Sequence, residues 1–264
     1  MANDLTNYAE GLIGAHLFRS STWTKPTSVY VGLLTAVADA ETGSVTEVTG
    51  GSYARVAVAC ADASWTPPSG GNRLFSNAQV ITFPTPTGTW GTVTHFGLFD
   101  ASTAGNALVI APLTASRSVV NGDAAPSFAI DTLRISFTGA WSNYLAGVVG
   151  NHLLRTATFT KPTALYAAIF VSGAEVSGNG YARAACHPSD GNWSAPSGGN
   201  GQFANAVPIT WPTPSAAWGT ISDVVLYDAS SAGNEWCRCT GMSYAMDPSA
   251  PTTLPVGALV ATIG

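Results

Sequence analysis

The chain has 264 residues, of which 46% are hydrophobic and 9% are charged, and its formal net charge is −5. The length allows two ordinary domains with sizeable cores. The charge content lies far below the roughly 25% of an average soluble domain and disfavours an enzyme. No stretch is rich in Lys and Arg, which argues against nucleic-acid binding.

No run of about 18 apolar residues is present, so the sequence argues against a transmembrane helix. The first residues, Met1 to Asp4, lack a basic region followed by an apolar one and therefore predict no signal peptide. We expect synthesis in a cytoplasm. The low charge implies a surface of Thr, Ser, Asn, Gly and Ala, which is typical of extracellular, viral and densely assembled proteins.

The first predicted element is an amphipathic helix over residues 5–19, with Asn3, Asp4 or Thr6 as candidate caps. Its apolar face follows the i, i+3, i+4, i+7 spacing of a helix: Leu5, Tyr8, Ala9, Leu12, Ile13, His16 and Leu17. The pattern returns 136 residues later in Trp141, Tyr144, Leu145, Val148, Val149, His152 and Leu153. A second copy of the element therefore starts there, and His16 is equivalent to His152.

A proline-containing linker and a strand follow each predicted helix. Residues 24–27 match 160–163, where the proline stops the helix, and strands are predicted at 29–34 and 165–170. The first copy then carries eight residues more than the second, within Thr35 to Thr46. Loops tolerate such insertions. We therefore expect a surface loop here, at which the two copies could differ in partner.

Further strands are predicted in both copies. They lie at 56–59, 78–83, 108–113 and 128–137, with counterparts at 184–186, 206–211, 236–242 and 256–263. Loops punctuated by Pro and Gly, at 65–72 and 193–200, separate the first two strands of each set. Pro208 removes one strand donor, which indicates an edge or a bulge.

The clearest duplication is a strand that runs into a turn. Trp90 to Asn106 aligns with Trp218 to Asn234 at a constant offset of 128 residues. Its β-branched and aromatic residues predict the strand, and the Asp-Ala-Ser-x-Ala-Gly-Asn tail predicts the turn. We therefore predict a mainly β protein with two tandem homologous β-sandwich (barrel-like) domains, each with an N-terminal α-helix, at residues 1–138 and 139–264. The short joint at 138–140 should hold the domains close together.

Carboxylates are the first candidates for chemistry. Asp100 and Asp228 end the duplicated strands, and Asp62 and Asp190 form a second equivalent pair. A glycan hydrolase needs two carboxyls in one cleft, and loss of activity in Asp100→Asn would be its test. We favour Asx-type turns for Asp100 and Asp228, and contacts within loops for the other pair.

Histidines and cysteines form no catalytic or metal-binding motif. His16 and His152 lie on apolar helix faces, which favours buried structural histidines; His95 becomes Asp223 in the second copy, and His187 has no counterpart. The cysteines occupy non-equivalent positions and are expected to be free buried or half-buried thiols: Cys60, Cys186, Cys237 and Cys239. We assign no catalytic, cofactor-binding or metal-binding residue, and we expect no cofactor.

Four tryptophans in or near the loops leave two interpretations open: Trp65, Trp90, Trp193 and Trp218. Exposed tryptophans beside polar loops could stack on sugar rings. Alternatively, each side chain plugs the end of a sandwich core under a Pro-rich loop. We favour the plug.

The chain resembles small virion proteins of tailed bacteriophages, the phage tail-fibre-like family. The motifs are an Asn-Tyr helix (Asn7, Tyr8), a Pro-x-x-x-Tyr-Val-x-Leu strand (26–33), a Glu-Val-x-Gly-Gly-x-Tyr-Ala-Arg element (47–55) and Trp-Gly-Thr-Val-Thr-His-Phe-Gly-Leu-Phe-Asp (90–100). The second copy departs at Asp223 and at Val225, which replaces Gly97. The resemblance implies a structural protein of a phage particle, with other virion proteins as partners.

The sequence therefore predicts a non-enzymatic virion protein. A compact chain without a coiled-coil or β-helical shaft, with two closely joined domains, favours a capsid decoration (cement) protein that bridges capsid subunits through avidity. We expect the major capsid protein or other virion proteins as partners, and a homo-oligomer on the particle. The alternative is a tail or head fibre protein that binds a host surface glycan or receptor through the loops of Trp65 and Trp193.

Overall fold

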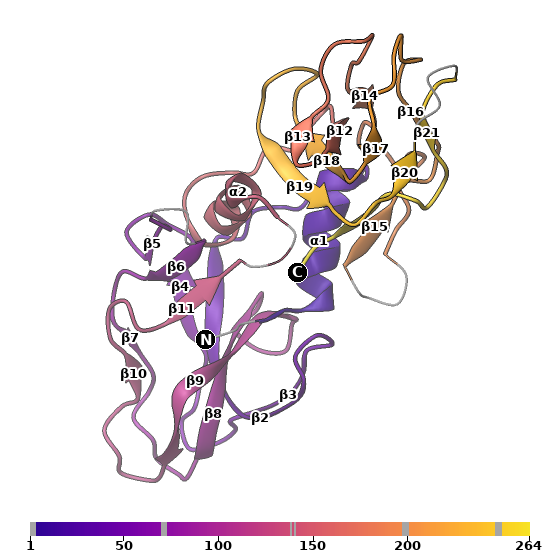
Figure 1. Ribbon diagram of the computed structural model, residues 1–264. Coiled ribbons are helices and arrows are strands. Elements are labelled where there is room, and N and C mark those ends of the chain that lie inside the picture. The colour runs from indigo at the N-terminus through magenta and orange to yellow at the C-terminus, as the bar shows by residue number, and fades with distance from the viewer. Residues whose placement is uncertain (1–3, 70–72, 138, 140, 197–200, 246–249) are drawn as a thin grey trace.

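The computed structural model describes residues 4–69, 73–137, 139, 141–196, 201–245 and 250–264. It is an elongated molecule of two lobes, one for each repeat, built mainly of strands with one helix in each repeat (Figure 1). The predicted mainly β fold with an N-terminal helix in each copy is confirmed. The expected loop segments 70–72 and 197–200, and positions 138 and 140 of the joint, lie outside the described residues.

The first repeat contains one large open sheet and two small ones. The large sheet has the order β1-β9-β8-β2-β3, and β4 also pairs with β2. Its strands are β1 (Asp4–Leu5), β2 (Ser28–Asp39), β3 (Ser44–Glu47), β4 (Val56–Ala59), β8 (Gly91–Phe99) and β9 (Ala107–Val119). The small sheets are formed by β5 (Trp65–Thr66), β6 (Leu74–Asn77) and β11 (Arg134–Ser136), and by β7 (Ile81–Thr82) and β10 (Ser127–Phe128).

The second repeat reproduces this arrangement with shorter strands. Its main sheet has the order β13-β12-β18-β19, and β14 also pairs with β12. These strands are β12 (Tyr166–Val171), β13 (Ala174–Glu175), β14 (Ala184–Ala185), β18 (Asp223–Tyr227) and β19 (Glu235–Cys239). Three antiparallel pairs complete the lobe: β15 (Gln202–Ala204) with β22 (Val260–Thr262), β16 (Ile209–Thr210) with β21 (Thr253–Leu254), and β17 (Thr220–Ile221) with β20 (Tyr244–Ala245).

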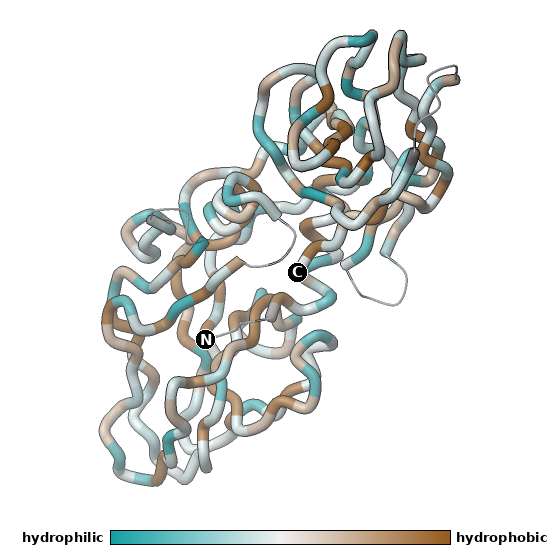
Figure 2. The backbone as a smooth tube through the Cα atoms, in the orientation of Figure 1, coloured by the Kyte–Doolittle hydropathy of each residue, from teal (hydrophilic) through white to brown (hydrophobic). Residues whose placement is uncertain are grey.

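The core of each lobe lies between the main sheet and the small sheets. Alternate residues of the central strands point inward, and in the first repeat Phe96 of β8 meets Phe128 of β10 with ring centroids 5.6 Å apart. Figure 2 shows hydrophobic stretches along the strands of both lobes and along the helices. Burial of these faces is the main driving force for folding.

The four candidate tryptophans are buried, which confirms the plug. Trp65 and Trp193 have no exposed surface, and Trp90 and Trp218 are 4% and 8% exposed. The indole N–H groups of Trp65 and Trp193 donate to the carbonyl oxygens of Ala59 and Cys186. Sugar stacking on these four side chains is excluded, because their ring faces are covered.

Some predicted boundaries were wrong. The expected surface loop at 35–46 is a β-hairpin, because β2 continues to Asp39 and pairs with β3. The predicted strands at 78–83 and 206–211 shrink to β7 and β16, and Pro208 directly precedes β16, in keeping with its missing donor. Local β propensity was therefore a poor guide to strand length, which the cross-strand partners determine.

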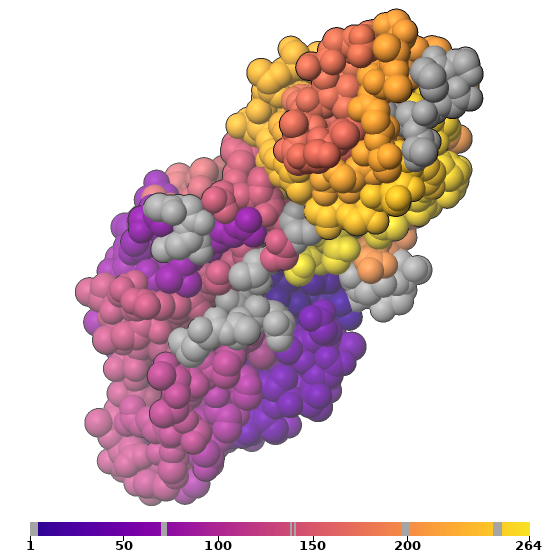
Figure 3. Space-filling model, in the orientation of Figure 1, coloured from indigo at the N-terminus to yellow at the C-terminus, as the bar shows by residue number. Residues whose placement is uncertain are grey.

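The two helices pack across the repeats. α1 (Asn7–Phe18) begins beside β9 of its own repeat but enters the second lobe, where the ring of Phe18 lies 4.6 Å from that of Trp193. α2 (Asn143–Leu154) enters the first lobe, where Gly150 lies against Phe75. In Figure 1 the indigo α1 lies beside β15, and in Figure 3 its indigo atoms lie against the yellow end of the chain. The lobes are held together by exchanged helices.

This exchange changes which helix residues are buried. Tyr8 belongs to the predicted apolar face but is 42% exposed, whereas Glu10, Gly14 and Phe18 are buried. α1 has covering elements on two sides, so a single amphipathic face does not describe it. The close association that we expected from the short joint is present, and the helices provide it.

Candidate functional site

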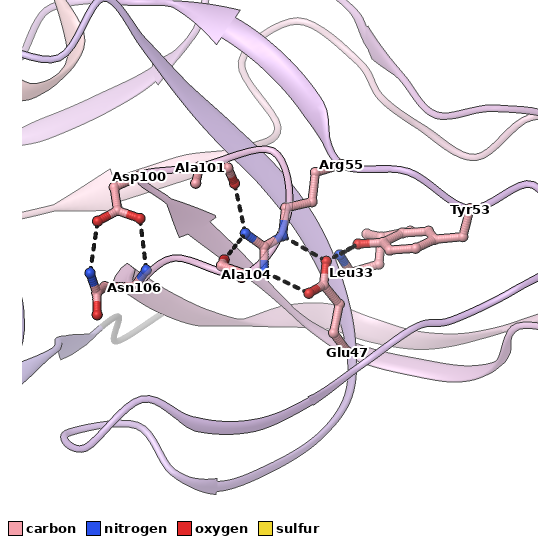
Figure 4. A network of polar contacts seen from close by, with 8 residues as sticks. All are labelled: Leu33, Glu47, Tyr53, Arg55, Asp100, Ala101, Ala104 and Asn106. Carbon is pink, nitrogen blue, oxygen red and sulfur yellow. Dashed lines mark hydrogen bonds and ion pairs between the residues drawn. The ribbon is translucent and has the colours of Figure 1, made fainter.

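A polar network around Arg55 ties three segments of the first repeat together (Figure 4). Arg55 donates through Nε and Nη2 to the two carboxylate oxygens of Glu47, at 2.8 and 2.7 Å. Its Nη1 donates to the carbonyl oxygens of Ala101 and Ala104, both at 2.7 Å, and its guanidinium stacks on Phe99. The planar fork of arginine suits this combination of partners. It fastens the turn after β8 to the edge strand β3.

Tyr53 extends the network to the centre of the sheet. Its hydroxyl donates to Oε1 of Glu47 at 2.7 Å and accepts from the backbone N–H of Leu33 at 2.8 Å. Burial, together with the hydrogen bond to Glu47, raises the pKa of Tyr53 well above its ordinary value. The phenol therefore remains a protonated donor at physiological pH.

The second repeat contains the same network, residue for residue. Its members are Glu175, Tyr181, Arg183, Ala229 and Ala232. The hydrogen bonds from Arg183 lower the pKa of Glu175, so this carboxylate is ionised. The guanidinium of Arg183 lies 3.7 Å from the Tyr227 ring centroid, where the first repeat has a phenylalanine.

Asp100 and Asp228 accept backbone N–H groups, as predicted, but the donors lie six residues on, whereas an Asx-turn uses the residue two on, so the predicted turn type was wrong. Asp100 accepts from the backbone N–H of Asn106 at 2.7 Å and from its side-chain amide at 2.9 Å. Asp228 makes the same two bonds to Asn234. A Cβ on Gly105, whose φ is +69°, would lie 2.3 Å from Oδ1 of Asp100, so this turn requires glycine.

The network supports structure rather than catalysis. Its carboxylate, phenol and guanidinium are engaged with one another and with backbone groups, so none of them is poised as a nucleophile or base. The second predicted carboxylate pair does not join it, because Asp62 and Asp190 bind arginines of the opposite repeat. The two carboxyls required by a glycan hydrolase are therefore not brought together here.

Replacement of Arg55 by lysine is expected to lower the free energy of unfolding by about 2 kcal/mol. Lysine keeps the charge, but its single nitrogen cannot serve Glu47 and both carbonyls. Urea denaturation monitored by tryptophan fluorescence measures the change. Arg134→Lys is the matched control, because its ion pair with Asp131 is about half exposed and should contribute little to stability. Equal losses in the two variants would contradict the role of the network.

The predicted structural histidines meet between the lobes. The rings of His16 and His152 are stacked with centroids 6.1 Å apart. Nδ1 of each ring accepts a backbone N–H, from Trp23 in one case and from Phe159 in the other, and Nε2 of His16 donates to the Phe159 carbonyl. Burial lowers the pKa of both rings, to about 4 for His152. Both are therefore neutral at physiological pH.

Ion pairs at the ends of the helices complete the exchange. Arg19, the C-cap of α1, donates to the carbonyl oxygen of Trp193 and lies 3.2 Å from the carboxylate of Asp190. The backbone N–H of Ser20 also donates to Asp190. The equivalent contacts at the end of α2 are made by Arg155 with Trp65 and Asp62, and by the backbone N–H of Thr156 with Asp62. The hydrogen-bond and ion-pair partners of the Asp62 and Asp190 carboxylates therefore lie in the opposite repeat, and not in their own loops as we expected.

The four cysteines are free thiols, as predicted, and Cys239 is the least buried of them. Burial raises the pKa of Cys60 to about 11 and those of Cys186 and Cys239 to about 12, which makes them poor nucleophiles. Within the described ranges, no group of three or more His, Cys, Asp or Glu side chains could hold a metal ion.

Sequence reasoning missed the residues that position the exchanged helices. Gly14 and Gly150 allow Phe203 and Phe75 to touch the helix backbone. A glycine inside a helix costs about 1 kcal/mol relative to alanine, and both copies carry it at the same place. That coincidence was a weak signal for a close contact, because Gly11 and Gly147 are duplicated in the same way and a Cβ on either would meet nothing within 4 Å. It did not indicate that the contact comes from the other repeat.

The comparisons with known proteins agree with this architecture. Neither helix in the part of the chain that the structure describes is long and apolar enough to cross a bilayer. A search among curated proteins found no match. A family model described as "Podophage GP4 fiber I protein gp80" matches residues 4–136 and again residues 140–242, one stretch in each repeat. Most of the chain is covered, and it belongs to this phage fibre protein family.

Proposed function

We propose that the protein is a non-enzymatic structural component of a phage particle that bridges two neighbouring subunits as one rigid body. The observation that carries this proposal is the helix exchange. Each lobe is completed by a helix of the other, so the two lobes present their outer surfaces at a fixed spacing. A rigid pair of modest docking faces gains affinity from effective concentration, because the second contact forms without a further loss of freedom.

Among structural roles in a phage particle, the fold best supports decoration of the capsid. The described lobes contain strands of at most 13 residues and two helices of 12 residues, which make a clamp rather than a shaft. The main partner would be the major capsid protein, and several copies would occupy the lattice. The second candidate, a tail or head fibre protein that contacts the host surface, is supported by the chain's membership of a phage fibre protein family.

Immunogold labelling or cryo-electron microscopy of intact particles tests the proposal. Many copies spread over the head would support the decoration role, and particles lacking the protein should then lose capsid stability on heating. Label confined to the neck or the tail would contradict the decoration role and favour the fibre candidate. Absence of label from purified particles would contradict the structural role itself.

A further inference from the structure

We propose that a groove at the N-terminus of α2 binds an acidic peptide turn of another protein. The groove has a volume of about 720 Å³. Residues from both repeats line it, among them Arg73, Asn143, Tyr144, Glu235, Arg238 and Thr240. It arises where the eight residues missing from the second repeat would otherwise lie.

The first repeat shows what fills the equivalent place. The β2–β3 hairpin folds its tip over the start of α1, and the carbonyl oxygen of Glu41 accepts from the backbone N–H of Asn7 at 2.7 Å. Gly43 of the same turn lies near Thr6 and Ala107. This turn is acidic, because Asp39 and Glu41 flank its first residue. An acidic turn therefore covers the N-terminus of one of two equivalent helices, through a backbone carbonyl, while the Asp39 carboxylate accepts from the N–H groups of Glu41 and Thr42.

The local frame at the two helices is otherwise the same. Thr6 caps α1 and donates to the carbonyl of Ala107, while Ser142 caps α2 and donates to the carbonyl of Glu235. In the second repeat the hairpin closes at once, between Val171 at the end of β12 and Ala174 at the start of β13. The N–H of Asn143, the counterpart of Asn7, therefore borders the open groove instead of a hairpin tip.

The electrostatics of the groove favour an anionic occupant. α1 carries Glu10 in its first turn, whereas α2 has no acidic residue there. The positive end of the α2 dipole is instead accompanied by Arg73, whose Nε donates to Oδ1 of Asn143 at 2.7 Å. Arg238 adds a second cation, which forms an ion pair with Glu235 at 3.0 Å. Arg73 and the helix N-terminus therefore supply the net positive charge, against Asp228, which binds Asn234 of the lining.

The floor of the groove is polar, whereas the equivalent surface of the first repeat is apolar. A polar occupant therefore fits the groove better than an apolar one. In the first repeat, Ala107 and Ile110 belong to an apolar cluster that Val37, Ala40 and Val45 of the hairpin cover. Glu235 and Arg238 replace that pair in the second repeat. The groove therefore matches the acidic tip of the hairpin and not its apolar flanks.

The probe is a cyclic peptide that carries the first-repeat turn Asp-Ala-Glu-Thr-Gly-Ser (39–44), added to the isotopically labelled full chain. We expect saturable shifts of the Asn143 and Tyr144 amide resonances, with those of Asn7 and Tyr8 unchanged because their own hairpin covers them. The uncharged peptide, with Asn and Gln in place of Asp and Glu, should bind about tenfold more weakly. No shift at Asn143, or equal binding of the two peptides, would overturn the proposal.

Variants of the chain make the test independent of the peptide. Arg73→Gln combined with Arg238→Gln should weaken binding about tenfold, whereas Arg117→Gln, an exposed arginine of β9, should leave it unchanged. Replacing Ser172 and Gly173 by residues 36–45 should fill the groove and abolish binding. Binding that survives either groove variant would overturn the proposal, provided that near-ultraviolet circular dichroism shows native folds.

An acidic glycan is the main competing occupant. Polygalacturonate that shifts the Asn143 and Tyr144 amides while the peptide does not would contradict the proposal. Binding by the isolated chain does not depend on the proposed function. Only the assignment of the natural turn to another particle protein rests on it, so particle localisation can fail while the binding result stands.

Discussion

Replacement of Gly14 by alanine is expected to destabilise the protein by about 3 kcal/mol, although alanine is the better helix former. A Cβ at this position would lie 1.9 Å from Cε2 of Phe203. The Phe203 ring has no exposed surface and packs against Phe18, so it has no free space into which to move. Urea denaturation of the full chain, followed by circular dichroism, measures the loss.

The same helix supplies the matched control for this variant. Gly11 lies one turn earlier, and a Cβ there would meet nothing within 4 Å. Gly11→Ala should therefore stabilise the protein by roughly 0.5–1 kcal/mol. Gly150→Ala and Gly147→Ala form the equivalent pair in α2. A stabilising effect of Gly14→Ala would contradict the packing of α1 in the second lobe.

The free energy of unfolding should fall by about 2 kcal/mol between pH 7 and pH 5 because of His152 alone. Burial lowers the pKa of His152 to about 4 in the folded protein, against about 6.5 when unfolded. Below pH 6.5 the His152 imidazole binds a proton in the unfolded chain but stays neutral in the folded chain. Acid therefore favours unfolding until the folded ring is also protonated, near pH 4. His16, whose pKa is also lowered, adds to the loss.

Urea denaturation at half-unit steps from pH 7 to pH 5 measures this slope, in a range above the ordinary pKa values of the carboxylates. His152→Asn keeps an acceptor for the N–H of Phe159 and should flatten the slope, at some loss of stability at pH 7. His187→Gln controls for the removal of a histidine outside the pair. An unchanged slope in His152→Asn would refute the assignment.

The local elements and the plugs were accessible from the sequence, because short-range patterns encode them. The offset between the Trp90 and Trp218 stretches revealed the duplication, and the Asp-to-Asn spacing of their tails predicted turns that the structure contains. The buried histidines followed from their helical positions. For the turns and the histidines, the residues that determine the feature lie within a few positions of one another, and the duplication needed only a comparison of the chain with itself.

The exchange of helices was not accessible. The periodicity of residues 5–19 is the same whichever lobe the helix enters, and the homologous lobes offer similar surfaces. The path of the linker after each helix, and contacts such as that of Arg19 with Asp190, determine which lobe the helix enters. No local sequence pattern indicates either of them. The groove was missed for a related reason, since a deletion was visible but the shape that it left was not.

The exchange also governs how the chain is made. α1 is synthesised first, but Trp193, the partner of Arg19, lies 174 residues further along the chain. Contacts of such long sequence separation are slow to form. The first lobe likewise cannot be completed until α2 has been synthesised. A nascent or truncated chain that ends before Trp193 therefore leaves α1 without the second-repeat residues against which it packs, and one that ends before Asn143 also leaves the first lobe without α2. Completion of synthesis is thus a condition for stability, and incomplete products remain open to proteolysis.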